Sequence, residues 1–64
     1  MIINGQEYTM NNPMNLLVYL NEKNYPLDKI AIELNGDIIP KAKYASTILN
    51  PHDKLEIVTF VGGG

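Results

Sequence analysis

Apolar and polar positions along the chain predict a β-sheet built largely from two hairpins. Each hairpin consists of two β-favouring runs joined by Asn-Gly: 1–3 and 6–10 around Asn4-Gly5, and 29–34 and 37–39 around Asn35-Gly36. Asn-Gly favours a type I′ turn, because both central residues of that turn need a positive φ angle. The sequence therefore predicts four strands in two antiparallel pairs.

The length of the first turn fixes the expected register of its hairpin. A two-residue turn at Asn4-Gly5 places Ile3 opposite Gln6, Ile2 opposite Glu7 and Met1 opposite Tyr8. The residues that then share the predicted core face are Met1, Ile3, Tyr8 and Met10.

In the second hairpin, alternation places Ile30, Ile32 and Leu34 on the core face. Pro40 ends this hairpin, since proline has no backbone N–H to donate to a ladder.

A helix is expected between the hairpins. Asn12 is the predicted N-cap and Pro13 the first helical residue, where the missing N–H costs nothing. Asn24-Tyr25-Pro26 ends the helix, because the residue before proline avoids the α region. The helix is about ten residues long on this interpretation, and its apolar stripe consists of Met14, Leu16, Leu17 and Leu20.

The last third of the chain predicts one more strand. Residues 41–49 suit a helical turn followed by an extended piece, with Ala42, Ala45, Ile48 and Leu49 as its apolar positions. Asn50–Asp53 is a turn by composition. In the strand 54–60 that follows, Leu55 and Ile57 face inward, whereas Glu56, Val58 and Phe60 face outward.

This order of elements favours an α+β fold of the β-grasp, or ubiquitin-like, type. We expect a mixed sheet of about four to five strands, with one main helix packed on one face. The first and last strands would lie parallel at its centre. Residues 1–61 form the expected domain and residues 62–64 a flexible glycine tail.

Composition narrows the possible functions. The chain of 64 residues has no cysteine, one histidine and a net charge of −2, and all five of its basic residues are lysines. Disulfides and thiol chemistry are therefore excluded, and nucleic-acid binding is not expected without arginines or a basic stripe. No apolar run approaches the length of a membrane span, so we expect a cytoplasmic monomer with no membrane association.

Candidate catalytic residues are few and isolated. His52 lies in the predicted turn without a nucleophile or an orienting group at a recognisable spacing. Asp37 and Asp53 are typical turn-bracing residues, and Ser46 and Thr47 lack the surroundings of an activated hydroxyl. We expect no enzyme activity, no metal site and no bound cofactor.

The last residues are the strongest functional candidate. Gly62, Gly63 and Gly64 have no side chains, and three extended residues reach about 10 Å. They would present the α-carboxylate of Gly64 to a narrow partner pocket. Val58, Phe60 and Val61, which precede the glycines, are the predicted docking residues for that partner.

Specific residues in the second half resemble the ThiS family of sulfur-carrier proteins in thiamin thiazole biosynthesis. The segments that carry the resemblance are the hairpin 32–41, the Tyr44-Ala45 pair, the strand 53–58 and the terminus 60–64. His52 departs from the family, in which glycine usually precedes the aspartate of this turn.

The resemblance implies a chemistry for Gly64. In the family, a ThiF- or MoeB-like enzyme uses ATP to adenylate the terminal carboxylate. Sulfur from a cysteine desulfurase relay then displaces AMP and leaves a thiocarboxylate, which the thiazole synthase ThiG receives. ATP belongs to the activating enzyme, so this chain would be a protein co-substrate.

Two alternatives stay open at this point. The small subunit of molybdopterin synthase shares the fold and the adenylation chemistry, but it is usually longer and more often ends in two glycines. A ubiquitin-like interaction module would use the fold without any terminal chemistry. An autonomous enzyme is a remote third alternative.

Overall fold

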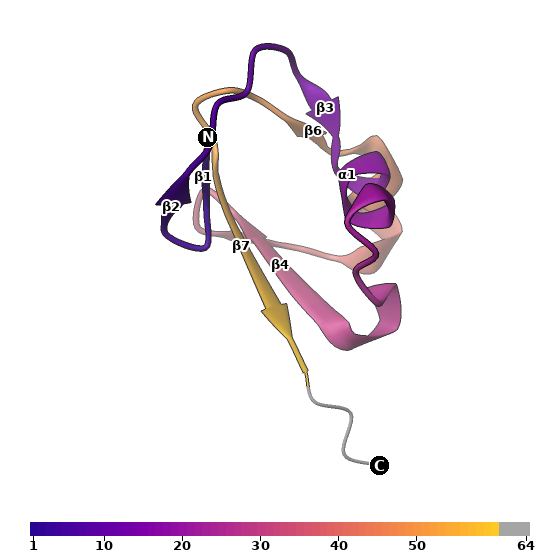
Figure 1. The fold of residues 1–64 in the computed structure, drawn as a ribbon. Coiled ribbons are helices and arrows are strands. Elements are labelled where there is room, and N and C mark those ends of the chain that lie inside the picture. Colours follow the sequence, from indigo (N-terminus) through magenta and orange to yellow (C-terminus); the bar gives the residue numbers. More distant parts are fainter. Residues whose placement is uncertain (61–64) are drawn as a thin grey trace.

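A five-stranded mixed sheet in the order β2-β1-β7-β4-β5 is the framework of the protein (Figure 1). The structure, a computed structural model, describes residues 1–60. Its strands are β1 (Ile2–Ile3), β2 (Gln6–Glu7), β3 (Met14–Asn15), β4 (Ile30–Leu34), β5 (Asp37–Ile39), β6 (Ile48–Leu49) and β7 (Lys54–Thr59). Its helices are α1 (Leu16–Glu22) and two 3₁₀ helices, η1 (Leu27–Lys29) and η2 (Lys41–Ser46).

Strand β7 occupies the centre of the sheet, parallel to β1 and antiparallel to β4. Figure 1 shows α1 on one face of this sheet, and within residues 1–60 no helix covers the opposite face. The predicted β-grasp arrangement is confirmed, including the parallel pairing of the first and last strands. We call the uncovered side the outer face.

Both predicted hairpins form, and the first has the expected register. Ile2 pairs with Glu7 and Ile3 with Gln6 in the first hairpin. The turn residues Asn4 and Asn35 have φ angles of 50° and 52°, and each is followed by a glycine that also has a positive φ. These are the angles that a type I′ turn requires, and asparagine tolerates them better than most residues.

The core lies between the inner face of the sheet and the helices. Leu16 and Leu20 on α1 are fully buried, as are Leu49 and Leu55, and Ile32 is nearly so. Burying one such side chain contributes roughly 1.5–3 kcal/mol. The complete set of buried apolar residues is Met1, Ile3, Leu16, Leu20, Ile30, Ile32, Tyr44, Leu49, Leu55 and Ile57.

The predicted start of the helix is wrong by three residues. Asn15, not Asn12, is the N-cap, and its side chain accepts a hydrogen bond from the N–H of Val18 at 3.0 Å. Met14 and Asn15 pair instead with β6 in a two-stranded sheet. Leu16 also donates its N–H to the carbonyl of Thr47. This long-range pairing satisfies the backbone of residues 14–16 and delays the helix.

The predicted end of the helix is confirmed. Asn24 follows the last turn with a φ of 60°, the left-handed conformation that commonly ends helices. Tyr25 then donates its N–H to the carbonyl of Leu20.

The core face of the first hairpin was predicted only in part. Met1 and Ile3 are buried, and Met10 packs partly against the core. Tyr8 is 48% exposed, however, and its hydroxyl donates to the side chain of Gln6 at 2.9 Å. Tyr8 directly follows β2, the edge strand of the sheet, and its ring lines an open cavity between this segment and α1.

The segment 41–49 is a helical turn followed by an extended piece, as predicted. Of its expected apolar positions Leu49 is buried as predicted, whereas Ala42, Ala45 and Ile48 are exposed. Tyr44, which was not among them, is the other buried residue of the segment. Burial raises the pKa of the Tyr44 hydroxyl above its usual value.

Candidate functional site

The strand that leads to the C-terminal glycines is hydrogen-bonded on both sides. β7 pairs with β1 through Lys54 and Leu55, and with β4 along Leu55–Thr59. One further bond, from the N–H of Phe60 to the carbonyl of Lys29 at 2.7 Å, extends the pairing past the end of the strand. The last described residue is therefore attached to the centre of the sheet.

The asparagines of the two hairpin turns also hold β7. Asn4 accepts a hydrogen bond from the N–H of Ile57 at 2.8 Å, and Asn35 accepts one from the N–H of Lys54 at 2.9 Å. Asn35 additionally donates to the carboxylate of Asp53. Each Asn-Gly turn therefore does two things: it sets a hairpin register, and it fixes the position of the central strand.

The predicted docking residues lie where alternation placed them. Val58 and Phe60 are 57% and 51% exposed, whereas Leu55 and Ile57 on the same strand are buried. Val61, also predicted as a docking residue, lies outside the described residues, as do the three predicted tail positions Gly62, Gly63 and Gly64.

Ile38 on β5 is a third exposed apolar residue of the outer face, and the sequence interpretation missed it. It is 69% exposed and pairs with Glu33, which in turn pairs with Glu56 on β7. The register of the Asn35-Gly36 turn could have revealed it, since a two-residue turn places Ile38 opposite the outward-facing Glu33. Ala31, the partner of Val58, completes the apolar area.

The side chains with possible catalytic chemistry stay separate. His52 is exposed in the turn before β7. Asp53 accepts from the N–H of Asn50 at 2.8 Å as well as from Asn35, so it braces this turn as predicted. Among residues 1–60, no three His, Cys, Asp or Glu side chains gather as a metal site would require.

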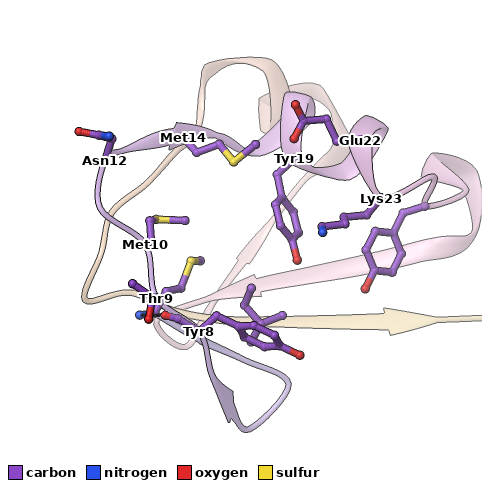
Figure 2. Close-up of a pocket in the computed structure, with 11 residues that line it drawn as sticks. Tyr8, Thr9, Met10, Asn12, Met14, Tyr19, Glu22 and Lys23 are labelled. Carbon is purple, nitrogen blue, oxygen red and sulfur yellow. Dashed lines mark hydrogen bonds between the residues drawn. The ribbon is translucent and has the colours of Figure 1, made fainter.

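A cavity of about 510 Å³ opens on the other side of the sheet, between α1 and the segment after β2 (Figure 2). Met10 and Met14 line it together with Tyr8, Tyr19 and Lys23. Burial, with Tyr25 and Tyr8 nearby, raises the pKa of the Tyr19 hydroxyl above 10.0, so this phenol stays protonated at neutral pH.

Among the described residues, no helix has the length and apolar composition that crossing a lipid bilayer requires.

Comparisons with known proteins identify relatives over the whole chain. The model of the ThiS family matches residues 1–64. The uncharacterized protein ycf40 of Pyropia yezoensis is 40% identical over 62 residues, which cover 97% of this chain and 87% of that protein. A thiazole synthase of Paramagnetospirillum magneticum is 42% identical over 64 residues, all of this chain but only 20% of that longer protein.

A solved structure agrees with this assignment. The crystal structure of the thiamine biosynthesis protein ThiS from Geobacter metallireducens superimposes with a TM-score of 0.81 at 26% identity, covering 98% of this chain and 96% of that one. Sequence and fold therefore lead to the same conclusion: the chain belongs to the ThiS family.

Proposed function

We propose that this protein is a sulfur carrier in the formation of the thiamin thiazole. The α-carboxylate of Gly64 attacks the α-phosphate of ATP inside a ThiF- or MoeB-like enzyme, and pyrophosphate leaves. The terminal sulfur of a persulfide on a cysteine desulfurase relay attacks the acyl carbon, and AMP leaves. A thiol of the relay then attacks the resulting acyl disulfide, which releases the thiocarboxylate and leaves a disulfide on the relay. The resulting thiocarboxylate passes its sulfur to a thiazole synthase of the ThiG type.

The observation that carries this proposal is the match of the ThiS family over residues 1–64, which includes the three terminal glycines. The arrangement of β7 is compatible with it, because this strand is paired with β1 at its start and stays hydrogen-bonded on the β4 side up to Phe60. The chain supplies the carboxylate, whereas ATP and the catalytic groups belong to the activating enzyme. The chain itself is then a co-substrate that binds no cofactor.

The thiazole synthase relatives support the choice of pathway. In the proteins of Paramagnetospirillum magneticum and Magnetococcus marinus, a region similar to this chain makes up 20% and 19% of a polypeptide named thiazole synthase. Such a region inside the synthase polypeptide is consistent with a carrier that acts beside that enzyme. This observation favours the thiamin pathway over molybdenum cofactor synthesis.

Intact mass spectrometry tests the proposal directly. The protein is incubated with ATP, the adenylating enzyme, a cysteine desulfurase and cysteine. The expected product carries one sulfur in place of one oxygen, and fragmentation places the change at Gly64. An unchanged mass, under conditions that convert an established carrier, would reject the proposal.

We further propose that Val58, Phe60 and Val61 dock the activating enzyme, with Ile38 as an addition from the structure. Contiguous exposed apolar residues are typical of the central part of a protein interface. Val58 lies near the end of β7 and Phe60 directly follows the strand. A partner bound to these two residues would therefore be only two residues along the chain from Gly62.

Replacing Phe60 by alanine tests this docking surface. We expect adenylation to weaken about 10-fold or more, as for an aromatic interface residue. The free energy of unfolding should change by less than about 1 kcal/mol, because half of the ring is already exposed. Initial rates of pyrophosphate release and urea denaturation measure the two effects. A stability loss of several kcal/mol would instead assign Phe60 to the core.

A further inference from the structure

Two glutamates lie directly opposite each other on neighbouring strands of the outer face. Glu33 on β4 and Glu56 on β7 are register partners in the antiparallel ladder. Both are half-buried, and both alternate with buried inward-facing residues on their strands. Like charges placed directly opposite in a sheet destabilise it. We therefore expect a local repulsion at the centre of the sheet.

No cation of the described residues forms an ion pair with either carboxylate. Within residues 1–60 the one ion pair joins Lys41 to Asp28, on other elements. Lys54 borders a neighbouring hollow together with Glu33 and Glu56, but it forms no ion pair with them. The local repulsion is therefore not relieved by a salt bridge within this part of the chain.

The carboxylates also border a shallow hollow of about 70 Å³ on the outer face. The exposed aliphatic side chains of Ile38 and Val58 also line it, together with Ala31. Half-buried acidic groups beside aliphatic walls suit a cation that can donate several hydrogen bonds and also lie against apolar carbon. Arginine has both properties, since its planar guanidinium binds carboxylates bidentately and is more weakly hydrated than an ammonium group.

We propose that Glu33 and Glu56 together bind an arginine side chain of the thiazole synthase, which enters the hollow beside Ile38 and Val58. This inference rests on the proposed function for the choice of partner. Binding of the synthase to the outer face would neutralise the repulsion between the carboxylates and bury the aliphatic side chains at the same time. The two carboxylates then destabilise the isolated sheet but strengthen the binding of the partner, a trade-off common at binding sites.

Matched charge variants test the proposal. Glu33→Gln/Glu56→Gln removes the pair, whereas Glu7→Gln/Glu22→Gln removes two exposed carboxylates from β2 and α1. Each double variant brings the net charge from −2 to 0 (−2 + 2), so a general charge effect would weaken both equally. Calorimetric titration of the unmodified full-length chain into thiazole synthase, at low and high salt, measures the Kd.

We expect Glu33→Gln/Glu56→Gln to raise the Kd about 10- to 100-fold, as for a lost pair of charge-assisted hydrogen bonds, and to reduce its salt dependence. The control should stay within about 2-fold. The melting temperature of Glu33→Gln/Glu56→Gln should equal or exceed that of the wild type, because the repulsion is gone. That result would separate a recognition role from a structural one.

Equal weakening of the two variants, or no weakening of either, would overturn the proposal, as would a wild-type chain that does not bind the synthase. A lower melting temperature for the pair variant would assign the carboxylates to the fold. The thiocarboxylate assay uses the wild-type chain and contains no thiazole synthase, so its outcome does not depend on the binding results. A chain that binds through the pair but never gains sulfur would contradict the proposed function alone.

Discussion

Deletion of Gly64, or addition of a single residue after it, is expected to abolish thiocarboxylate formation. Either change moves the reacting carboxylate by about 3.5 Å relative to β7. A misplacement of about 1 Å can already cost a factor of roughly 100 in rate. We therefore expect a loss of more than about 100-fold, measured as the fraction of protein that gains sulfur in a fixed time.

The type of residue added distinguishes the effect of chain length from the effect of side-chain size. One extra glycine changes only the distance to the carboxylate, whereas an added leucine also places a side chain where the wild type has none. Wild-type protein and Val18→Ala, an exposed change on α1, are the controls and should react normally. Normal sulfur transfer to an extended chain would contradict the carrier proposal and favour an interaction module without terminal chemistry.

Truncation of Leu20 is expected to have the largest effect on stability. Its side chain is fully buried between α1 and the sheet, so Leu20→Ala removes contacts and leaves a cavity. Such changes cost about 2–5 kcal/mol. A domain of this size has a total stability of roughly 3–10 kcal/mol, at about 0.05–0.15 kcal/mol per residue. Urea denaturation should show a midpoint far below that of the wild type.

Val18→Ala is the matched control for this prediction as well. Val18 lies on the same helix and is 49% exposed, so its truncation should change stability by less than about 1 kcal/mol. A loss of less than 1 kcal/mol for Leu20→Ala would mean that the core at α1 relaxes around the missing atoms. Equal losses for the two variants would contradict the packing of α1 described above.

The hairpins could be predicted from the sequence because their information is local. Asn4-Gly5 and Asn35-Gly36 specify both the turn and its length, and a two-residue turn leaves one register. Alternation then assigns the faces of β4 and β7, including the exposure of Val58 and Phe60. The same reasoning would have placed Ile38 beside them, had it been applied to the short strand β5.

The start of the helix could not be predicted in this way. Asn12-Pro13 and Asn15 are both acceptable helix beginnings by local preference. The choice depends on β6, more than thirty residues later, which pairs with Met14 and Asn15. Asn15 is held further by a hydrogen bond to the carbonyl of Ala45 at 2.8 Å. The exposure of Tyr8 likewise depends on which elements pack against its ring in the folded protein.

The sequence by itself determined the order of the elements along the chain, the two turns, the outward side of β7 and the glycine terminus. Each of these depends on residues that are neighbours in the chain. Only the tertiary structure decided where α1 begins and which residues anchor 41–49. It also brought Glu33 and Glu56, 23 positions apart, to the same point on the outer face (56 − 33 = 23). Proximity of that kind depends on pairing between strands that are distant in the sequence, which no local pattern encodes.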